Sequence, residues 1–335
     1  MLAIAERLGI VDIFDACYAN SSAMHHLLIC FVVFSAFCSV CQSQPIFKVI
    51  PLGVRGGNDE SNLSAYALAV SGTNAYVCLD AGTLYHGINQ AISANLFEGT
   101  PLEVLRSRIK GYLISHPHLD HVAGLILNSP DDSPKPIYGL PFCLKVIQEA
   151  YFNWKSWPNF GNEGEKPLLN KYRYTTLSTE EEMPLEQTSM HVKAFTLSHS
   201  HPYQSTAFLI RHADSYVLYV GDTGADSVEQ SNKLYELWQA ISPLIVGGTL
   251  KALFIEVSFT NAQPDQLLFG HLTPRFLMKE MKILSELSGG LGDLPIVITH
   301  SKPFASLKEI KRELTESNDL QLKLIFAEQA KLLEF

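Results

Sequence analysis

The stretch Ile114–Pro130 reads ISHPHLDHVAGLILNSP and carries three histidines and an aspartate within six residues, namely His116, His118, Asp120 and His121. An apolar run precedes these residues and an amphipathic run follows them, which predicts a strand, a turn and then a helix. Residues two apart at the end of a strand point the same way, so we expect His116 and His118 to bind one metal ion. Asp120 and His121 lie where the helix begins and would face a second ion.

The residue types in this stretch suit divalent metals. Neutral imidazole and carboxylate groups are ligands for zinc and similar ions. Two such ions about 3.5–4 Å apart can share a hydroxide and hold a substrate between them. A surface loop that is merely rich in histidine is the simplest alternative, but a strand, ligands and a helix follow one another here in the order that a metal site requires. The stretch therefore predicts a two-metal centre.

The composition is that of an acidic globular protein. The chain has 335 residues, of which 47% are hydrophobic and 18% charged, and a formal net charge of −9. This is enough for one large core. A protein that holds long nucleic acid through its phosphates presents a basic face, so we expect no nucleic-acid polymer as a partner. The six cysteines, with Cys78 and Cys143 alone in the main body, are expected to be small apolar residues without a disulfide framework.

Residues 1–43 are expected to form a leader, and its segment 27–40 is almost wholly apolar. The segment is shorter than the roughly 20 residues that span a bilayer, but it has the length of the apolar region of a secretory signal. We therefore expect export to the periplasm or the medium, or tethering to a membrane. A buried terminal helix in a cytoplasmic protein is the alternative, and Met24 is a second candidate start. Residues 44–335 would form the main domain.

From residue 45 the chain reads as hairpins followed by strand–helix units, which predicts an α/β fold with mixed sheets and helices on the outside. Residues 71–74 (SGTN) have the composition of a hairpin turn. Residues 155–186 read as an irregular insertion near the mouth of the site. Strands are predicted at 45–54, 65–70, 75–79, 109–114, 136–139, 191–197, 206–211, 216–220, 252–257, 296–299 and 322–326. Helices are predicted at 84–96, 101–108, 142–154, 231–241 and 274–287, the last with Thr273 as its cap.

Four later strands contain or lead into a residue that can bind metal: His199, Asp222, Glu256 and His300. A single histidine at the end of a strand is more often structural. Together with the first cluster, however, these residues complete a two-metal set, with three nitrogens and a shared carboxylate for one ion and two nitrogens, Asp120 and that carboxylate for the other. An aspartate suits the shared position because it has two oxygens.

Asp80 also ends a predicted strand. We expect it to accept hydrogen bonds from loop amides rather than to bind metal.

Longer motifs resemble the class II cyclic-nucleotide phosphodiesterases of the metallo-β-lactamase superfamily. The signature HPHLDH at 116–121 is followed by Gly124-Leu125 and Asn128-Ser129-Pro130. The similarity covers most of residues 46–326 and continues through 197–199 (LSH), 205–209 (STAFL), 221–224 (GDTG), 255–259 (IEVSF), 268–274 (LFGHLTP) and 299–303 (THSKP). The resemblance implies an αββα sandwich of two mixed sheets for the catalytic domain at 44–335.

The resemblance also implies two divalent metal ions, with zinc the expected metal, held by His116, His118, Asp120, His121, Asp222, His300 and a further histidine. Asp222 would bridge the two ions. His199 matches the strand-end position of the further histidine. His201 stays as the alternative, because its spacing to the next strand is better if the loop is short.

The implied activity is hydrolysis of cAMP, cGMP or both to nucleoside 5′-monophosphates by a hydroxide that bridges the two ions. The implied catalytic residues are Asp120, His271 and Glu256, with His271 as the proton donor or phosphate contact and Glu256 as its support. The expected partner is a small cyclic nucleotide, and the sequence is compatible with a homodimer without specifying one.

Three other functions are compatible with the same fold. A tRNA 3′-end endonuclease would need a basic arm, and the acidic balance disfavours it. A hydrolase of thioesters or lactams would not need the longer phosphodiesterase motifs. A non-catalytic binding member is disfavoured because no position of the metal site is substituted.

Overall fold

The computed structural model describes residues 44–57, 59–302 and 307–335. Residues Pro45–Phe335 form one unit. The predicted leader, its apolar segment 27–40 and the alternative start at Met24 lie outside the described residues. Among the described residues, none of the helices is both long and apolar enough to cross a membrane.

The first sheet of the described residues has seven strands in the order β14-β1-β2-β3-β4-β5-β6. The pairs β14–β1, β1–β2 and β2–β3 are antiparallel, whereas β3 to β6 run parallel. The predicted hairpin at 71–74 is therefore confirmed. The strands are β1 (Phe47–Gly53), β2 (Ala65–Val70), β3 (Tyr76–Leu79), β4 (Ile109–Leu113), β5 (Lys135–Gly139), β6 (Tyr172–Thr176) and β14 (Leu333–Glu334).

The second sheet also has seven described strands, in the order β13-β12-β11-β10-β9-β8-β7. Here β7 to β10 are joined as antiparallel neighbours and β10 to β13 run parallel. Both sheets are thus mixed, as the sequence predicts. The strands are β7 (Met183–Pro184), β8 (His191–Ser198), β9 (Gln204–His212), β10 (Ser215–Val220), β11 (Leu250–Glu256), β12 (Pro295–Thr299) and β13 (Lys323–Phe326).

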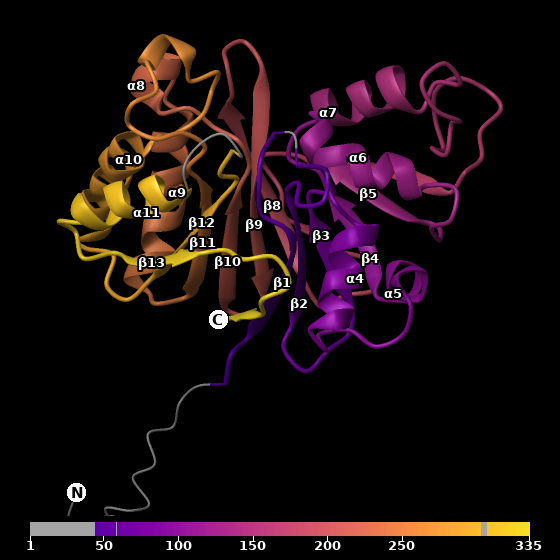
Figure 1. Ribbon diagram of the computed structural model, residues 1–335, viewed down its shortest axis with the longest axis horizontal. Coiled ribbons are helices and arrows are strands. Elements are labelled where there is room, and N and C mark those ends of the chain that lie inside the picture. The colour runs from indigo at the N-terminus through magenta and orange to yellow at the C-terminus, as the bar shows by residue number, and fades with distance from the viewer. Residues whose placement is uncertain (1–43, 58, 303–306) are drawn as a thin grey trace, which may run out of the picture. The chain divides into compact units, whose positions relative to one another are not determined.

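Helices cover the outer face of each sheet (Figure 1). The first sheet carries α4 (Tyr85–Ser93), α5 (Pro101–Ser107), α6 (Leu119–Asn128) and α7 (Pro141–Val146), which continues as one π-helical turn (Ile147–Tyr151). The second sheet carries α8 (Asp226–Glu229), α9 (Lys233–Val246), α10 (Pro274–Ser288) and α11 (Leu307–Glu316). The result is the predicted αββα sandwich.

Alternation of residue size along the strands explains how the layers pack. In β2, Tyr66 and Leu68 face the second sheet, and the alternating residues Ala65, Ala67 and Ala69 face the helices of the first sheet. Tyr66 meets Phe254 of β11 edge-on, with ring centroids 5.9 Å apart, and lies 5.7 Å from the ring of Tyr219 in β10. Such aromatic pairs bury large apolar areas and fix the contact between the two sheets.

Several elements and boundaries differ from the sequence prediction. The supposedly irregular segment 155–186 contains β6 and the short β7, and a further strand, β14, follows the strand predicted to be the last. The helix predicted at 142–154 ends at Tyr151, and α9 continues past Pro243 to Val246. Thr273 occupies the N-cap position of α10, but its buried hydroxyl makes no capping hydrogen bond.

The two cysteines of the main domain agree with the sequence prediction. Cys78 and Cys143 are both buried and free. The other four cysteines lie outside the described residues.

Candidate active site

The predicted ligands meet at the carboxyl ends of strands from both sheets. The first sheet supplies the residues that follow β4, and the second sheet supplies the residues that follow β8, β10 and β12. The two sets are His116, His118, Asp120 and His121 from the first sheet and His199, Asp222 and His300 from the second. Segments far apart in the sequence therefore build one site between the sheets.

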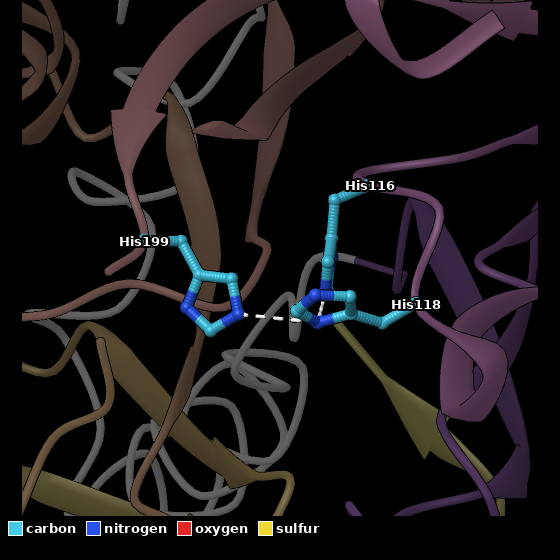
Figure 2. A group of neighbouring side chains, drawn as sticks. All are labelled: His116, His118 and His199. Atoms are coloured by element: carbon cyan, nitrogen blue, oxygen red, sulfur yellow. Dashed lines mark hydrogen bonds between the residues drawn. The ribbon is translucent and has the colours of Figure 1, made fainter. Parts of the chain in front are cut away.

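The first group of nitrogens belongs to His116, His118 and His199. Nε2 of His116 lies 3.0 Å from Nδ1 of His118, which lies 3.3 Å from Nε2 of His199 (Figure 2). Figure 2 shows the His199 ring reaching from one side of the site toward the other two rings. A tetrahedral zinc ion takes nitrogen ligands at about 2.0–2.1 Å, and three nitrogens on such a shell lie a little over 3 Å apart.

The second group consists of Asp120, His121 and His300. Nε2 of His121 is 3.0 Å from Nε2 of His300, which is 3.4 Å from Oδ2 of Asp120. His300 has a positive φ of 56° and lies against Gly56, where an added Cβ would fall 2.1 Å from Cε1 of the imidazole. A glycine at position 56 is therefore required for this placement of the His300 ring.

Asp222 stands between the two groups. Its Oδ2 lies 3.7 Å from Nε2 of His116, 3.3 Å from Nε2 of His121 and 3.2 Å from Nε2 of His300. A single carboxylate oxygen thus lies close to nitrogens of both groups. Asp222 therefore lies where a shared carboxylate is predicted, although one oxygen rather than two faces the histidines.

Hydrogen bonds on the far sides of the rings set which nitrogen is free. Nδ1 of His199 donates to the carbonyl of Gly270 at 2.8 Å, and Nδ1 of His121 donates to Oδ2 of Asp80 at 2.8 Å. Because a carbonyl or carboxylate oxygen can only accept, each Nδ1 carries the proton. In the neutral ring the Nε2 lone pair therefore faces the centre of the site, which is the tautomer that a metal ligand needs.

Asp80 has a larger role than its predicted one. It accepts from the backbone N–H of Ser115 at 2.7 Å, as expected. It also accepts from His121 and, at 2.7 Å, from the hydroxyl of Tyr219 in the second sheet. Its φ is 56°, a left-handed conformation that non-glycine residues seldom adopt. The sequence pattern, a strand followed by Asp-Ala-Gly, does not reveal the bond to His121.

The electrostatics of the site favour a cation. Within the described residues, the ion pairs of Asp80, Asp120, Asp222 and Glu256 are all with histidines and none is with lysine or arginine. Buried carboxylates need a compensating positive charge. The donor set of imidazoles and carboxylates therefore fits divalent metal ions.

The pKa shifts of the site residues also favour a bound cation. Burial lowers the pKa of His118 to about 4 and that of His116 well below its usual value. Burial alone would raise the pKa of Asp222, but His300 and His121 hold it well below its usual range. Burial would likewise lower the pKa of His121, and Asp222 and Asp80 raise it instead. The first group is therefore neutral while the second lies in a negative field.

The structure also brings together His271 and Glu256, the two residues predicted to act as a catalytic pair. Nδ1 of His271 lies 2.8 Å from Oε1 of Glu256, and both side chains are buried. Thr223 donates its backbone N–H to the same Oε1 at 3.0 Å. Burial lowers the pKa of His271 to about 4 and raises that of Glu256 to about 7. Nδ1 of His271 is 3.8 Å from Oδ2 of Asp222, so the pair adjoins the predicted ligands.

Of the two candidates for the further histidine, the structure brings His199 to the cluster and leaves His201 outside it. His199 is 1% exposed and its nitrogen lies among those of the first group. His201 is exposed and belongs to none of the ligand groups found in the described residues.

Three contacts at the site have no counterpart in the sequence reasoning. The ring of Tyr203 stacks on that of His118, with centroids 4.8 Å apart and planes 6° apart. The backbone N–H of Gly57 donates to Oδ2 of Asp120 at 2.9 Å. The hydroxyl of Ser258 lies 3.0 Å from Nδ1 of His300. The pair Gly56-Gly57 and the motif IEVSF at 255–259 are visible in the sequence, but the contacts of Gly57 and Ser258 are not.

Comparison with known proteins identifies the family. The model of the family described as cAMP phosphodiesterases class-II matches residues 94–329. A 3′,5′-cyclic-nucleotide phosphodiesterase of Aliivibrio fischeri is 42% identical over 327 residues, which cover 92% of this chain and 98% of that protein.

Solved structures agree on the fold. Unliganded yeast PDE1 matches with a TM-score of 0.76 and 23% identity, over 87% of this chain and 100% of that one. A metallo-β-lactamase fold protein from Bacillus subtilis matches with a TM-score of 0.57 and 17% identity, over 86% and 99% of the two chains. The chain therefore has the metallo-β-lactamase fold and belongs to the class II cAMP phosphodiesterases.

Proposed function

We propose that this chain hydrolyses 3′,5′-cyclic nucleotides, cAMP or cGMP, to nucleoside 5′-monophosphates. The observation that carries the proposal is the position of Asp222, whose Oδ2 lies within 3.7 Å of histidine nitrogens from both ligand groups. That geometry suits two adjacent cations, and the family membership of the chain supplies the substrate class.

The two ions would have separate sets of ligands. His116, His118 and His199 would hold one, Asp120, His121 and His300 the other, and Asp222 would contact both. Zinc is the metal that this donor set favours. When bound, two such ions lower the pKa of water and neutralise the charge of a cyclic phosphate.

The chain's own residues would manage the proton. In the reaction, water adds to phosphorus, the bond from phosphorus to the 3′ oxygen breaks, and the 3′ oxygen takes a proton. His271 would give that proton from Nε2. Glu256 would hold Nδ1 and, with its pKa raised to about 7 by burial, could return a proton to the ring at neutral pH.

A substrate panel tests the proposal. Zinc-loaded protein is incubated with cAMP, cGMP, a linear phosphodiester and nitrocefin, with and without chelator, and the nucleotide products are separated by chromatography. We expect 5′-AMP or 5′-GMP, lost on chelation, and little turnover of the other two substrates. Two bound metals without cyclic-nucleotide turnover would contradict the proposal and leave a non-catalytic binding member as the better description.

We further propose that residues 44–335 suffice for catalysis and that the leader directs export or tethers the chain to a membrane. The proposal rests on the apolar segment 27–40 and on the position of every predicted site residue after residue 44. The same panel, run on a variant that lacks residues 1–43, should give unchanged rates. Cell fractionation of the two proteins should then show a difference in location.

A further inference from the structure

The candidate ligand His199 stands in a tight turn between β8 and β9. Two backbone bonds close the turn, from His199 N–H to the carbonyl of Tyr203 at 3.1 Å and from Tyr203 N–H to the carbonyl of Ser200 at 3.2 Å. Ser200 has a φ of 58°, in the left-handed region that non-glycine residues avoid. Such a conformation persists only where contacts from elsewhere hold it.

The carboxylate of Glu229, at the end of α8, supplies such contacts. Its Oε2 accepts from the hydroxyl of Ser198 at 2.9 Å and from the backbone N–H of His201 at 2.9 Å. One oxygen is therefore bonded to the residue before His199 and to the residue two places after it. Glu229 is only 8% exposed, and its bond with Ser198 is buried and shielded from water.

The surroundings of Glu229 make this contact specific. Gly224 lies beside it, and a Cβ on this glycine would fall 2.5 Å from Cγ and from Oε1 of Glu229. The absence of a side chain at 224 is thus what lets the carboxylate reach the turn. The turn also borders a cavity of about 400 Å³ whose walls include Ser200, His201 and Glu229. On the side of this cavity the turn is not packed against other side chains, so the hydrogen bonds of Glu229 matter more for holding its conformation.

We propose that Glu229 is a positioning residue for the metal centre. Its carboxylate holds the turn so that Nε2 of His199 is directed at the His116–His118 pair. The proposal rests on the proposed role of His199 as a ligand. Glu229 touches no predicted ligand side chain, so it would act through the backbone on either side of His199. The consequence is that the affinity for one of the two ions depends on a residue of α8.

Zinc affinity tests this without reference to catalysis. Zinc is titrated against a competing chelator dye, and the absorption spectrum of the Co²⁺-substituted protein reports the ligand geometry. Groups that orient ligands are typically worth 10–100-fold in metal affinity. We expect Glu229→Ala to lower the affinity for one of the two zinc ions about tenfold and to leave the affinity for the other within about twofold of wild type. Glu229→Gln, which keeps an acceptor oxygen, should restore most of the loss.

Two further variants separate positioning from general damage. Gly224→Ala, which should displace the Glu229 carboxylate, is expected to reproduce the defect. Glu313→Ala is the matched control, since Glu313 is a partly buried acid of α11 whose carboxylate accepts from the backbone N–H of Asn261 at 2.8 Å, in a loop other than the turn. We expect it to lower the melting temperature without changing zinc affinity.

A double mutant decides whether the effect passes through His199. If it does, adding Glu229→Ala to His199→Ala should cause no further loss of zinc affinity, because the two changes remove one interaction. Additive losses would overturn the proposal. So would wild-type zinc affinity and a wild-type Co²⁺ spectrum in folded Glu229→Ala. Because no substrate is present, a failure of the proposed phosphodiesterase activity would appear separately, in the substrate panel.

Discussion

At the scale of single side chains, the site is organised by which atom of each ring carries a proton. His199 and His121 have their Nδ1 protons fixed by a carbonyl and a carboxylate, so in the neutral form of each ring the lone pair is on Nε2, which faces inward. His271 differs, because its Nδ1 faces Glu256 and lies outside the two ligand groups proposed for the ions. A residue in that position is better suited to moving a proton than to binding metal.

This distinction predicts the behaviour of His271→Ala. We expect turnover of cAMP to fall roughly 10²–10⁴-fold, the range for loss of a general acid, while both zinc ions remain. Steady-state rates and zinc content by mass spectrometry check the two halves of the prediction. His300→Ala is the matched control, because the nearby ring that it removes is a proposed ligand, and it should lose metal together with activity. Loss of zinc from His271→Ala would rule out the proton-donor role.

At the scale of elements, the candidate ligands at the ends of strands could be predicted from the sequence, whereas the residues that hold those ligands in place could not. A buried strand followed at once by His or Asp is visible in a single sequence, and the strands before His116, Asp222 and His300 are where they were predicted. Asp80 and Glu229 make contacts with partners 41 and 28 residues away. No local pattern encodes those contacts, because they depend on how the strands are stacked.

Missed elements have a similar cause. The strand β6 reads YRYTT and pairs with β5 at the edge of the first sheet of the described residues. Edge strands tolerate polar residues, and these obscure the alternation of apolar and polar residues that predicts a strand. The strand β14 has two residues and pairs with β1, nearly 300 residues earlier in the chain. Edge strands of this kind are set by tertiary pairing rather than by local sequence.

The edge formed by β4, β5 and β6 is held by a buried ion pair. Asp132 lies 2.7 Å from Nζ of Lys135 in β5 and accepts from the hydroxyls of Tyr112 in β4 and Tyr172 in β6 at 2.6 and 2.8 Å. Burial lowers the pKa of Lys135, and Asp132 opposes that shift. A single carboxylate thus joins three neighbouring strands.

Removal of this carboxylate should be costly. We expect Asp132→Ala to lower the free energy of unfolding by about 3–5 kcal/mol, because it leaves the buried Lys135 ammonium bonded to the carbonyl of Leu105 but without a compensating negative charge. Urea denaturation followed by circular dichroism measures the change. The surface pair Lys331–Glu328, at 3.2 Å, provides the control, since Glu328→Ala should cost less than about 1 kcal/mol. Equal costs for the two variants would contradict the assignment of Asp132 as a structural centre.

At the scale of the whole domain, the proposed metal ligands come from two separately built layers. Each sheet has its own apolar core against its own helices, and a third core lies between the sheets. Four of the proposed ligands belong to the first sheet and three to the second. Cations at the site would therefore hold the two sheets together as well as serve catalysis.

Metal removal should accordingly destabilise the entire domain rather than only the site. Ions that bind only the folded state at 1,000 times their Kd stabilise it by about 4 kcal/mol, which corresponds to a melting temperature shift on the order of 10 °C. We expect a chelator to lower the melting temperature by this amount and zinc to restore it. His116→Ala and His300→Ala, one from each sheet, should each reduce the shift markedly, because each removes a ligand from one of the two proposed ions that link the sheets. The exposed His86 on α4 is the matched control, and His86→Ala should keep the full shift. A zinc-dependent shift in melting temperature that is unchanged in both ligand variants would mean that zinc stabilises the fold by binding at another site.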